Sequence, residues 1–196
     1  AAVIACILLS GEAYSALATT PATENRVGSK RKRKKIILST YFDLFKSTWI
    51  AAATDSNISI ELHNLEENNL TSIKAHEVDL DTIFNNLLTN AFYSIKEKKD
   101  KVNRRLDIKC VVEDDLVHII FQDTGLGLAE EYKHNPEEIF NSFESSKKDR
   151  LGKQIGTGLG LYIVKSIISE YNNSAIRIVR DIEDGFAIQI TFKKAD

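Results

Sequence analysis

The order of helical and strand-like patterns between residues 36 and 194 constrains the fold of this 196-residue chain more than any other feature. Apolar side chains recur at helical spacing from Ile37 to about Asn57, and residues 58–62 then alternate as in a strand. Residues 79–99 have the pattern of a strongly amphipathic helix, with acidic residues at its start and lysines in its last turn. The remaining elements are predicted as strands over 106–113 and 116–123, a short helix over 136–143, a helix over 161–172 and a hairpin over 175–193.

This alternation of helices and strands predicts an α/β fold. The hairpin over residues 175–193, which turns at Asp184–Gly185, argues against an all-parallel sheet. We therefore expect a two-layer sandwich in which helices cover one face of a mixed, mostly antiparallel sheet. A content of 43% hydrophobic and 28% charged residues is ordinary for a globular protein with a real core.

The charge balance and the cysteine content limit which ligands, cross-links and cellular locations are expected. With 26 basic and 28 acidic residues the net charge is −2, so nothing in the overall charge draws the chain to nucleic acid. Cys6 and Cys110 are the only cysteines and lie far apart, which indicates neither a disulfide framework nor a metal cluster. A reducing compartment, and hence the cytoplasm, is the expected location.

The first 35 residues differ from the rest of the sequence. Their apolar opening is interrupted at residues 10–12, too early to span a bilayer, and we expect it to pack as a helix. A run of six basic residues, Lys30–Lys35, closes a linker-like stretch. We predict an N-terminal helical and linker segment over 1–35 and a folded domain over 36–196. Because the sequence contains no methionine, we expect it to be part of a longer protein, and membrane attachment would come only from segments outside it.

Two polar features interrupt the apolar elements. Asn86 and Asn90 are spaced i, i+4 within the helix predicted over 79–99, so both amides lie on one helix face. Their oxygens suit a hard cation such as Mg²⁺, although a pair of solvent-facing side chains fits equally well. Asp123 ends a hydrophobic strand and is followed by Gly125 and Gly127. A carboxylate in this place can accept a hydrogen bond from an exocyclic amine, and the glycines leave room for a flat ring. A plain turn fits the same residues equally well.

A third feature is the glycine-rich stretch "GTGLG", residues 156–160, which leads directly into a helix. Backbone N–H groups at a helix N-terminus favour anions, and phosphate is the obvious candidate. The stretch is not a Walker motif because no GK[ST] follows, and it follows a polar loop instead of a strand. The glycines are therefore predicted to admit phosphate.

Together these stretches resemble a known superfamily. "NNLLTNA", "DTGLG" and "GTGLGL" resemble the N, G1 and G2 boxes of the GHKL ATPases, which include gyrase, heat-shock chaperones, histidine kinases and mismatch-repair proteins. The chain is most similar to the catalytic ATP-binding domain of sensor histidine kinases, and "EEIFNSFESSK" resembles the F box of that group, with Phe140 and Phe143 in matching places. The resemblance covers roughly residues 36 to 194 and implies the Bergerat-type ATP-binding fold.

The resemblance also implies ligands, with ATP and Mg²⁺ as cofactors. Asn90 would bind the metal with Asn86 beside it, and Asp123 would bind adenine. Residues implied in binding the rest of the nucleotide are Gly125, Gly127, Phe143, Gly156, Thr157, Gly158, Leu159 and Gly160, and Lys147 or Lys148, in a lid over about 141–155, is a candidate for contacting the γ-phosphate.

Asn86 separates two chemistries within the superfamily. Hydrolysing members carry a glutamate there as a base, and an asparagine cannot serve, so the resemblance favours γ-phosphoryl transfer to a histidine of a dimerisation domain. A response regulator is then the expected partner. The sequence departs from many sensor kinases where Phe92, Tyr93 and Ser94 replace a lysine–tyrosine pair, and residues 1–62 contain no histidine to accept the phosphoryl group. A slow ATPase and a non-catalytic nucleotide sensor therefore stay open as alternatives.

Overall fold

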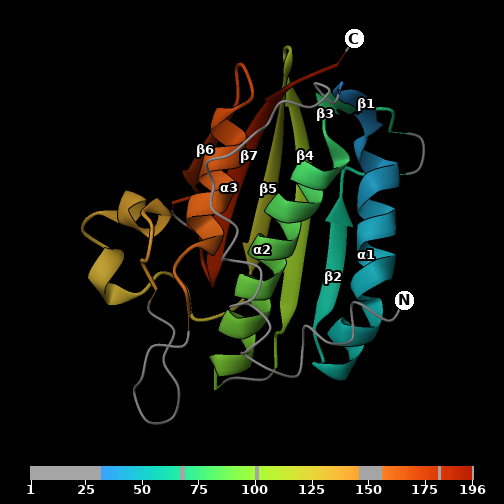
Figure 1. Cartoon of the computed structure of the whole chain (residues 1–196). Coiled ribbons are helices and arrows are strands. Elements are labelled where there is room, and N and C mark those ends of the chain that lie inside the picture. Colours follow the sequence, from blue (N-terminus) through green and yellow to red (C-terminus); the bar gives the residue numbers. More distant parts are fainter. Residues whose placement is uncertain (1–31, 67–68, 100–101, 146–155, 181, 196) are drawn as a thin grey trace. The chain divides into compact units, whose positions relative to one another are not determined.

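The computed structural model describes residues 32–66, 69–99, 102–145, 156–180 and 182–195 (Figure 1). All of its helices and strands belong to one compact unit, formed by Lys32–Ser146 and Thr157–Asp196. In chain order these elements are β1 (Lys34–Ile37), α1 (Leu38–Asp55), β2 (Ser59–His63), β3 (Ser72–Ala75), α2 (Glu77–Glu97), β4 (Arg105–Glu113), β5 (Leu116–Asp123), the 3₁₀ helices η1 (Glu130–Tyr132) and η2 (Pro136–Phe140), α3 (Gly160–Ser169), β6 (Ala175–Ile178) and β7 (Phe186–Lys193).

Five of the strands form one sheet in the order β2-β4-β5-β7-β6. Its pairings are antiparallel except for β2, which lies parallel to β4. The register places Asp123, the last residue of β5, between Leu106 of β4 and Phe186 of β7. The predicted mixed, mostly antiparallel sheet is confirmed.

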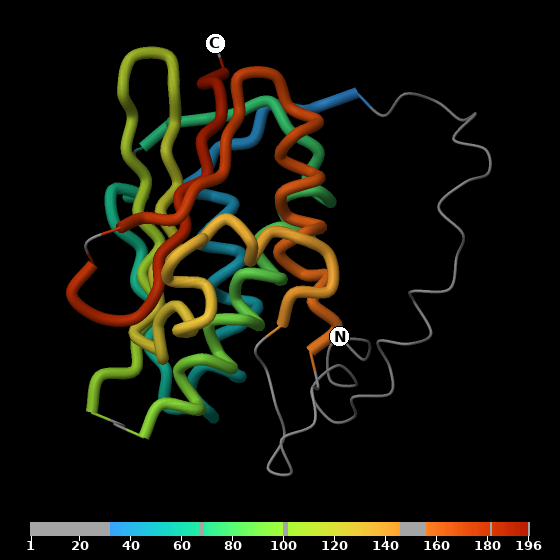
Figure 2. The backbone as a smooth tube through the Cα atoms, turned by 90° about the vertical axis from the view of Figure 1, so that its left-hand side faces the viewer, coloured from blue at the N-terminus to red at the C-terminus, as the bar shows by residue number. Residues whose placement is uncertain are grey.

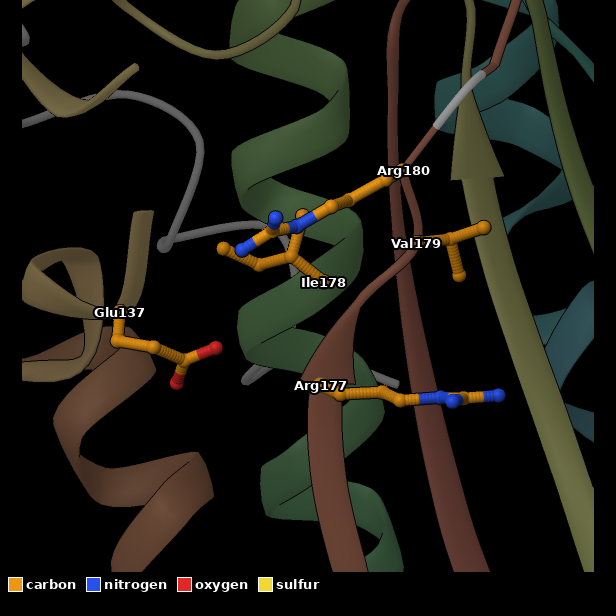
Figure 3. Close-up of a pocket in the computed structure, with 5 residues that line it drawn as sticks. All are labelled: Glu137, Arg177, Ile178, Val179 and Arg180. Atoms are coloured by element: carbon orange, nitrogen blue, oxygen red, sulfur yellow. The ribbon is translucent and has the colours of Figure 1, made fainter. Parts of the chain in front are cut away.

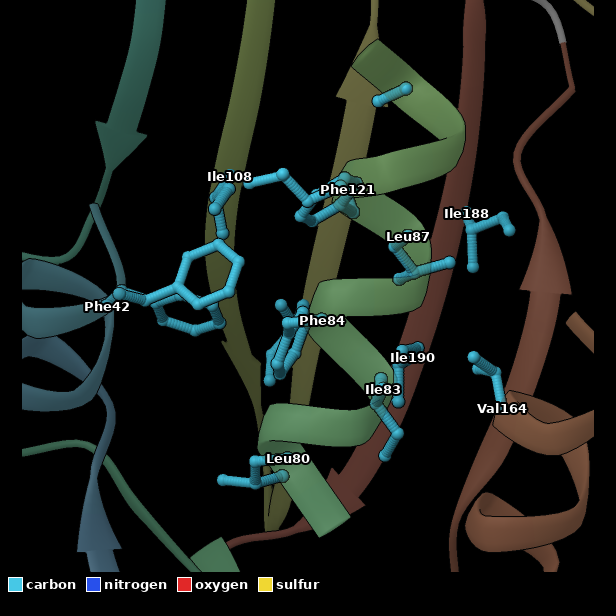
Figure 4. Packing of buried hydrophobic residues seen from close by; sticks show 14 of the residues in the cluster. Phe42, Leu80, Ile83, Phe84, Leu87, Ile108, Phe121, Val164, Ile188 and Ile190 are labelled. Atoms are coloured by element: carbon cyan, nitrogen blue, oxygen red, sulfur yellow. The ribbon is translucent and has the colours of Figure 1, made fainter. Parts of the chain in front are cut away.

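The α-helices α1, α2 and α3 cover one face of this sheet, so that strands and helices form two layers (Figures 1 and 2). Phe84 of α2 is fully buried between the layers, with its ring centroid 4.8 Å from that of Phe42 in α1 and 6.2 Å from that of Phe121 in β5 (Figure 4). Burial of a side chain of this size contributes roughly 1.5–3 kcal/mol to folding. This apolar contact fixes α2 across the middle of the sheet.

A second, two-stranded sheet is formed by β1 and β3, which pair antiparallel with Lys34 opposite Ala75. The sequence analysis did not predict it, because four residues in each strand are too few to show a period. β1 spans the boundary predicted after residue 35, and the division into 1–35 and 36–196 stays a prediction.

Tyr171, which follows α3, ties the C-terminal end of that helix to the start of α2. Its buried hydroxyl donates to Oδ2 of Asp79 (2.7 Å) and accepts from the backbone amide of His76 (3.1 Å). The guanidinium carbon of Arg33 lies 4.1 Å from the centroid of its ring, and the same side chain donates to the carbonyl of Glu170 (2.7 Å). A cation bound to the last carbonyls of a helix is favourable. These contacts fix the end of α3 opposite to Gly160.

The predicted elements are otherwise found, with small differences. The short helix predicted over 136–143 is the 3₁₀ helix η2, which ends at Phe140. The hairpin over 175–193 is confirmed as β6 and β7, with Gly185 in its connection at φ +77°. Within the described residues no helix is long and apolar enough to cross a membrane.

Candidate functional site

Four partly buried polar side chains follow one another along α2 in steps of four residues: Asn86, Asn90, Ser94 and Lys98. Lys98 is the C-cap of the helix. Residues four apart lie on neighbouring turns of one helix face, so this series forms a continuous stripe about 18 Å long at a rise of 1.5 Å per residue. Of the predicted site residues, Asn86 and Asn90 belong to this stripe, and Gly125 and Gly160 lie directly against it.

The asparagine end of the stripe lies against the start of α3. A Cβ atom on Gly160 would lie 2.9 Å from Oδ1 of Asn86 and 3.8 Å from Nδ2 of Asn90. Asn86 is also held by its own helix, because its Nδ2 donates to the carbonyl of Thr82 (2.7 Å). Both asparagines are therefore partly buried beside the glycine-rich stretch.

The first turn of α3 has the features of an anion-binding helix start. Leu159 is its N-cap, and no described side chain caps it with a hydrogen bond. Among the described residues, Oγ1 of Thr157 accepts a long hydrogen bond, of 3.4 Å, from the amide of Leu159. The N–H groups of such a turn are available to an anion and carry the positive end of the helix dipole. An anion there would lie next to Asn86 and Asn90.

The other end of the stripe lies against the loop after β5. Asp123 is 5% exposed, and its Oδ1 accepts a hydrogen bond from the amide of Gly125 (2.8 Å). Burial, the largest cause, raises the pKa of Asp123 to about 7; the Gly125 amide lowers it, and of the nearby charges Asp184 raises it and Lys98 lowers it. With Oδ1 occupied by the backbone amide, Oδ2 is the oxygen left to accept from a ligand.

Ser94 connects this loop to α2. Its Oγ accepts a hydrogen bond from the amide of Leu126 (2.8 Å). A Cβ on Gly125 would lie 2.2 Å from the same Oγ and 2.7 Å from the Ser94 carbonyl carbon, so only glycine fits between the loop and the helix. Gly127 has a φ of +79°, where glycine is favoured. The two glycines of the predicted base pocket thus have different roles, a close approach and a left-handed turn.

Lys98 completes the stripe, and the sequence analysis gave it no role. Its Nζ donates to the carbonyl of Thr124 (3.0 Å) and to Oδ1 of Asp184 in the β6–β7 connection (2.5 Å). Thr124 is itself held to β4, because its Oγ1 accepts from the amide of Arg105 (2.9 Å). The loop after Asp123 is therefore bound from two sides.

Phe143 and Gly158 meet beside the start of α3. The amide of Phe143 donates to the carbonyl of Gly158 (3.0 Å), and both residues have positive φ, 68° and 67°. The Phe143 side chain is 71% exposed. A bulky non-glycine residue in this backbone region is uncommon, and such conformations concentrate at functional sites. Phe140 has a different place, because it is buried under Nζ of Lys165.

Two surface hollows lie apart from this arrangement, and some predicted residues fall outside the described part of the chain. Lys147 and Lys148 lie outside the described residues, and Gly156 groups with a segment that is not described. Neither hollow contains any predicted site residue. One, of about 490 Å³, is lined by Glu137, Arg177, Ile178, Val179 and Arg180 (Figure 3), and the other, of about 410 Å³, by Thr54, Asn57, Ile58, Ser59, Val102, Asn103 and Arg104.

The described residues contain no cluster of three or more His, Cys, Asp or Glu side chains able to hold a metal ion. A cation at this site would depend on the amide oxygens of Asn86 and Asn90 together with ligand oxygens and water. That ligand set fits Mg²⁺, which takes few protein oxygens and keeps several waters, and it fits softer metals poorly.

Comparison with known proteins agrees with this geometry. The chain belongs to the family of histidine kinase-, DNA gyrase B- and HSP90-like ATPases, whose family model matches residues 75–196, more than half of the chain. ATP binding is therefore a property of its family. The sequence-based assignment to the GHKL superfamily is confirmed.

Individual relatives include histidine kinases. Histidine protein kinase SaeS of Staphylococcus aureus is 31% identical over 147 residues, which are 72% of this chain and 39% of the relative. The chain thus spans about two fifths of the length of the curated relatives it matches. The solved catalytic domain of histidine kinase ThkA has a similar fold, with a TM-score of 0.67, 21% identity and coverage of 83% of this chain and 96% of that one. ThkA in complex with the response regulator TrrA also matches, with a TM-score of 0.64 at 18% identity over 83% of this chain and 42% of that chain.

Proposed function

We propose that this chain binds ATP with Mg²⁺ and donates the γ-phosphoryl group to a histidine on a dimerisation segment, as the catalytic part of a two-component signalling kinase. The observation that carries the proposal is the stripe on α2. At one end of the stripe, the asparagines lie beside a helix N-terminus of the kind that binds phosphate. At the other end, a buried carboxylate lies beside a glycine-containing loop. A nucleoside triphosphate requires these two kinds of group at its two ends.

Each end has a defined chemical role. Oδ2 of Asp123 accepts a hydrogen bond from the exocyclic amine of adenine, and Gly125 and Gly127 give the base room beside the loop. The N–H groups at the start of α3, from Gly160 onward, donate to phosphate oxygens. Asn90, with Asn86 beside it, would hold Mg²⁺, which when bound neutralises charge on the β- and γ-phosphates.

Asn86 decides which reaction this arrangement favours. An amide cannot take a proton from water, and its Nδ2 is already committed to the Thr82 carbonyl. The chain therefore positions the triphosphate without activating water, and transfer to an external nucleophile is favoured over hydrolysis. Phosphoryl transfer depends mainly on such positioning and on electrostatic stabilisation.

The expected partners follow from this reaction. A phospho-accepting histidine would belong to a dimerisation domain, and a response regulator would take the phosphoryl group onward. The similarity to ThkA, which has been solved with a response regulator, supports the second expectation. We propose a cytoplasmic location, where ATP is available, and no role for nucleic acid.

The test is phosphoryl transfer from ATP labelled at the γ-phosphate to a separately produced, histidine-bearing dimerisation segment of a sensor kinase. The proposal predicts an acid-labile, base-stable product that requires this chain and Mg²⁺, with little release of free phosphate when the acceptor is omitted. Acceptor-independent phosphate release would favour the slow ATPase. Nucleotide binding with neither transfer nor release would favour the non-catalytic sensor.

A further inference from the structure

Lys98 occupies the base end of the α2 stripe in a way that the nucleotide-binding motifs do not account for. It lies just past the C-terminal end of α2, and its ammonium group is shared between the carbonyl of Thr124 and the carboxylate of Asp184. Thr124 directly follows Asp123, and Gly185 directly follows Asp184. One side chain therefore joins α2 to both loops beside the buried carboxylate.

The packing at this point leaves little freedom for the loops. A Cβ on Gly185 would lie 1.7 Å from the carbonyl oxygen of Asp123 and 2.8 Å from Cα of Thr124. The backbone of the β6–β7 connection thus lies directly on the residues that form the base site. Any movement of Asp184 would be transmitted to Asp123 through this backbone contact.

Among the described residues, two side chains of opposite charge act on Asp123. Lys98 faces it from α2 and Asp184 from the β6–β7 connection, while its sheet neighbours, Leu106 of β4 and Phe186 of β7, are apolar. Gly125 contributes its backbone amide. The two charged groups therefore act on the pKa of Asp123 in opposite directions.

We propose that Lys98 is a positioning residue for base recognition: its ammonium group holds the loop after Asp123 and the β6–β7 connection together, and it balances the negative charge of Asp184 beside the Asp123 carboxyl group that would accept from the exocyclic amine of adenine. This inference rests on the proposed ATP-binding function. Because Oδ1 of Asp123 accepts from Gly125, a proton on the carboxyl group would sit on Oδ2, the oxygen that must accept from adenine. Loss of the Lys98 ammonium group therefore weakens adenine binding most at pH values at which Asp123 is partly protonated.

Lys98→Met and Asp184→Asn break the same ion pair but change the charge near Asp123 in opposite directions. Lys98→Met leaves Asp184 uncompensated, which raises the pKa of Asp123 above the value of about 7 in the native protein. A rise of one unit lowers the ionised fraction at pH 7 from about one half to about one eleventh, so ATP affinity falls about fivefold. Asp184→Asn leaves the Lys98 charge uncompensated and lowers the pKa of Asp123, which strengthens ATP binding by up to about tenfold at pH 6 and about twofold at pH 7.

The experiment measures the dissociation constant of ATP at pH 6, 7 and 9 for the native chain and both variants. Lys99→Met is the matched control, because it removes the same charge from an exposed neighbouring side chain. The proposal predicts that ATP affinity falls in Lys98→Met and rises in Asp184→Asn at pH 6 and 7, that both changes become smaller at pH 9, that the control is unaltered, and that Lys98→Arg restores binding. Equal losses in both variants at every pH would overturn it and leave the ion pair a purely structural contact.

A second readout does not depend on ATP. NMR titration of the Asp123 carboxyl carbon in the nucleotide-free chain should show an upward shift of the pKa in Lys98→Met and a downward shift in Asp184→Asn. If the native chain fails to bind ATP, the proposed function fails, and this titration still decides whether Lys98 sets the ionisation of Asp123. Identical titration curves in all variants would overturn the inference.

Discussion

Asp123→Asn should stabilise the nucleotide-free protein at neutral and alkaline pH while removing a residue needed for adenine. Burial raises the pKa of the Asp123 carboxyl from 3.8 to about 7, so the folded protein holds a proton through a pH range in which the unfolded chain has lost it. The stability gained from this proton is present below pH 4 and is lost as the pH rises to about 7. Above pH 7 the folded protein carries a buried charge that the variant lacks.

The size of the effect follows from the shift. A difference of about 3 pKa units at 1.36 kcal/mol per unit corresponds to about 4 kcal/mol, and the residue is only 5% exposed, so screening by solvent is small. The difference in unfolding free energy between the variant and the native protein should therefore shift in favour of the variant by about 1.4 kcal/mol per pH unit between pH 4 and 7 and stay constant above pH 7. The asparagine oxygen can still accept from the Gly125 amide, so the loop itself is preserved.

Urea denaturation at pH 5 and pH 8.5, followed by tryptophan fluorescence, measures this difference. Trp49 is the only tryptophan, is 9% exposed, and donates to Oδ1 of Asn85 in α2, so it reports on the core between α1 and α2. If the unfolding free energy falls with urea concentration at the same slope in both proteins, the substitution has left the native fold unaltered. A stability difference that does not change with pH, or one that favours the native protein more at pH 8.5, would refute the reasoning about the buried carboxyl.

Two further substitutions test other contacts of the site, and a third tests the contact between the end of α3 and the start of α2. Gly125→Ala places a Cβ 2.2 Å from Oγ of Ser94 and should weaken ATP binding at least tenfold, measured by calorimetry; unchanged affinity would contradict the close approach. Gly160→Ala places a Cβ 2.9 Å from Oδ1 of Asn86 and should lower ATP affinity more with Mg²⁺ than without it; an equal loss under both conditions would speak against a metal there. Tyr171→Phe removes hydrogen bonds to the first turn of α2 and should cost about 1–2 kcal/mol of stability in urea denaturation, and no change would contradict that tie.

The main elements of the fold were predictable because their patterns are long. α2 spans 21 residues and carries several turns of a continuous apolar face, and β4 and β5 cover nine and eight residues. β1 and β3, with four residues each, escaped prediction, because such short runs can be paired only once the tertiary structure brings them together.

Within the site, local patterns again decided what the sequence could predict. Asn86 and Asn90 were identifiable because their i, i+4 spacing lies within one helix. Ser94 and Lys98 continue the same spacing, and this is the signal that would have identified them. Their roles depend on contacts with Leu126, 32 residues away, and Asp184, 86 residues away, which only the folded chain brings together.

Calorimetric titration with ATP, in the presence and absence of Mg²⁺, tests the central claim that the α2 stripe is a nucleotide site. The native chain should bind ATP·Mg²⁺ with a dissociation constant on the order of micromolar, or about −8 kcal/mol. Asp123→Asn should lose about 1–3 kcal/mol of that binding free energy, as expected for a polar contact left unsatisfied. Asn90→Ala should lose affinity only when Mg²⁺ is present. Failure of the native chain to bind ATP under either condition would contradict the account.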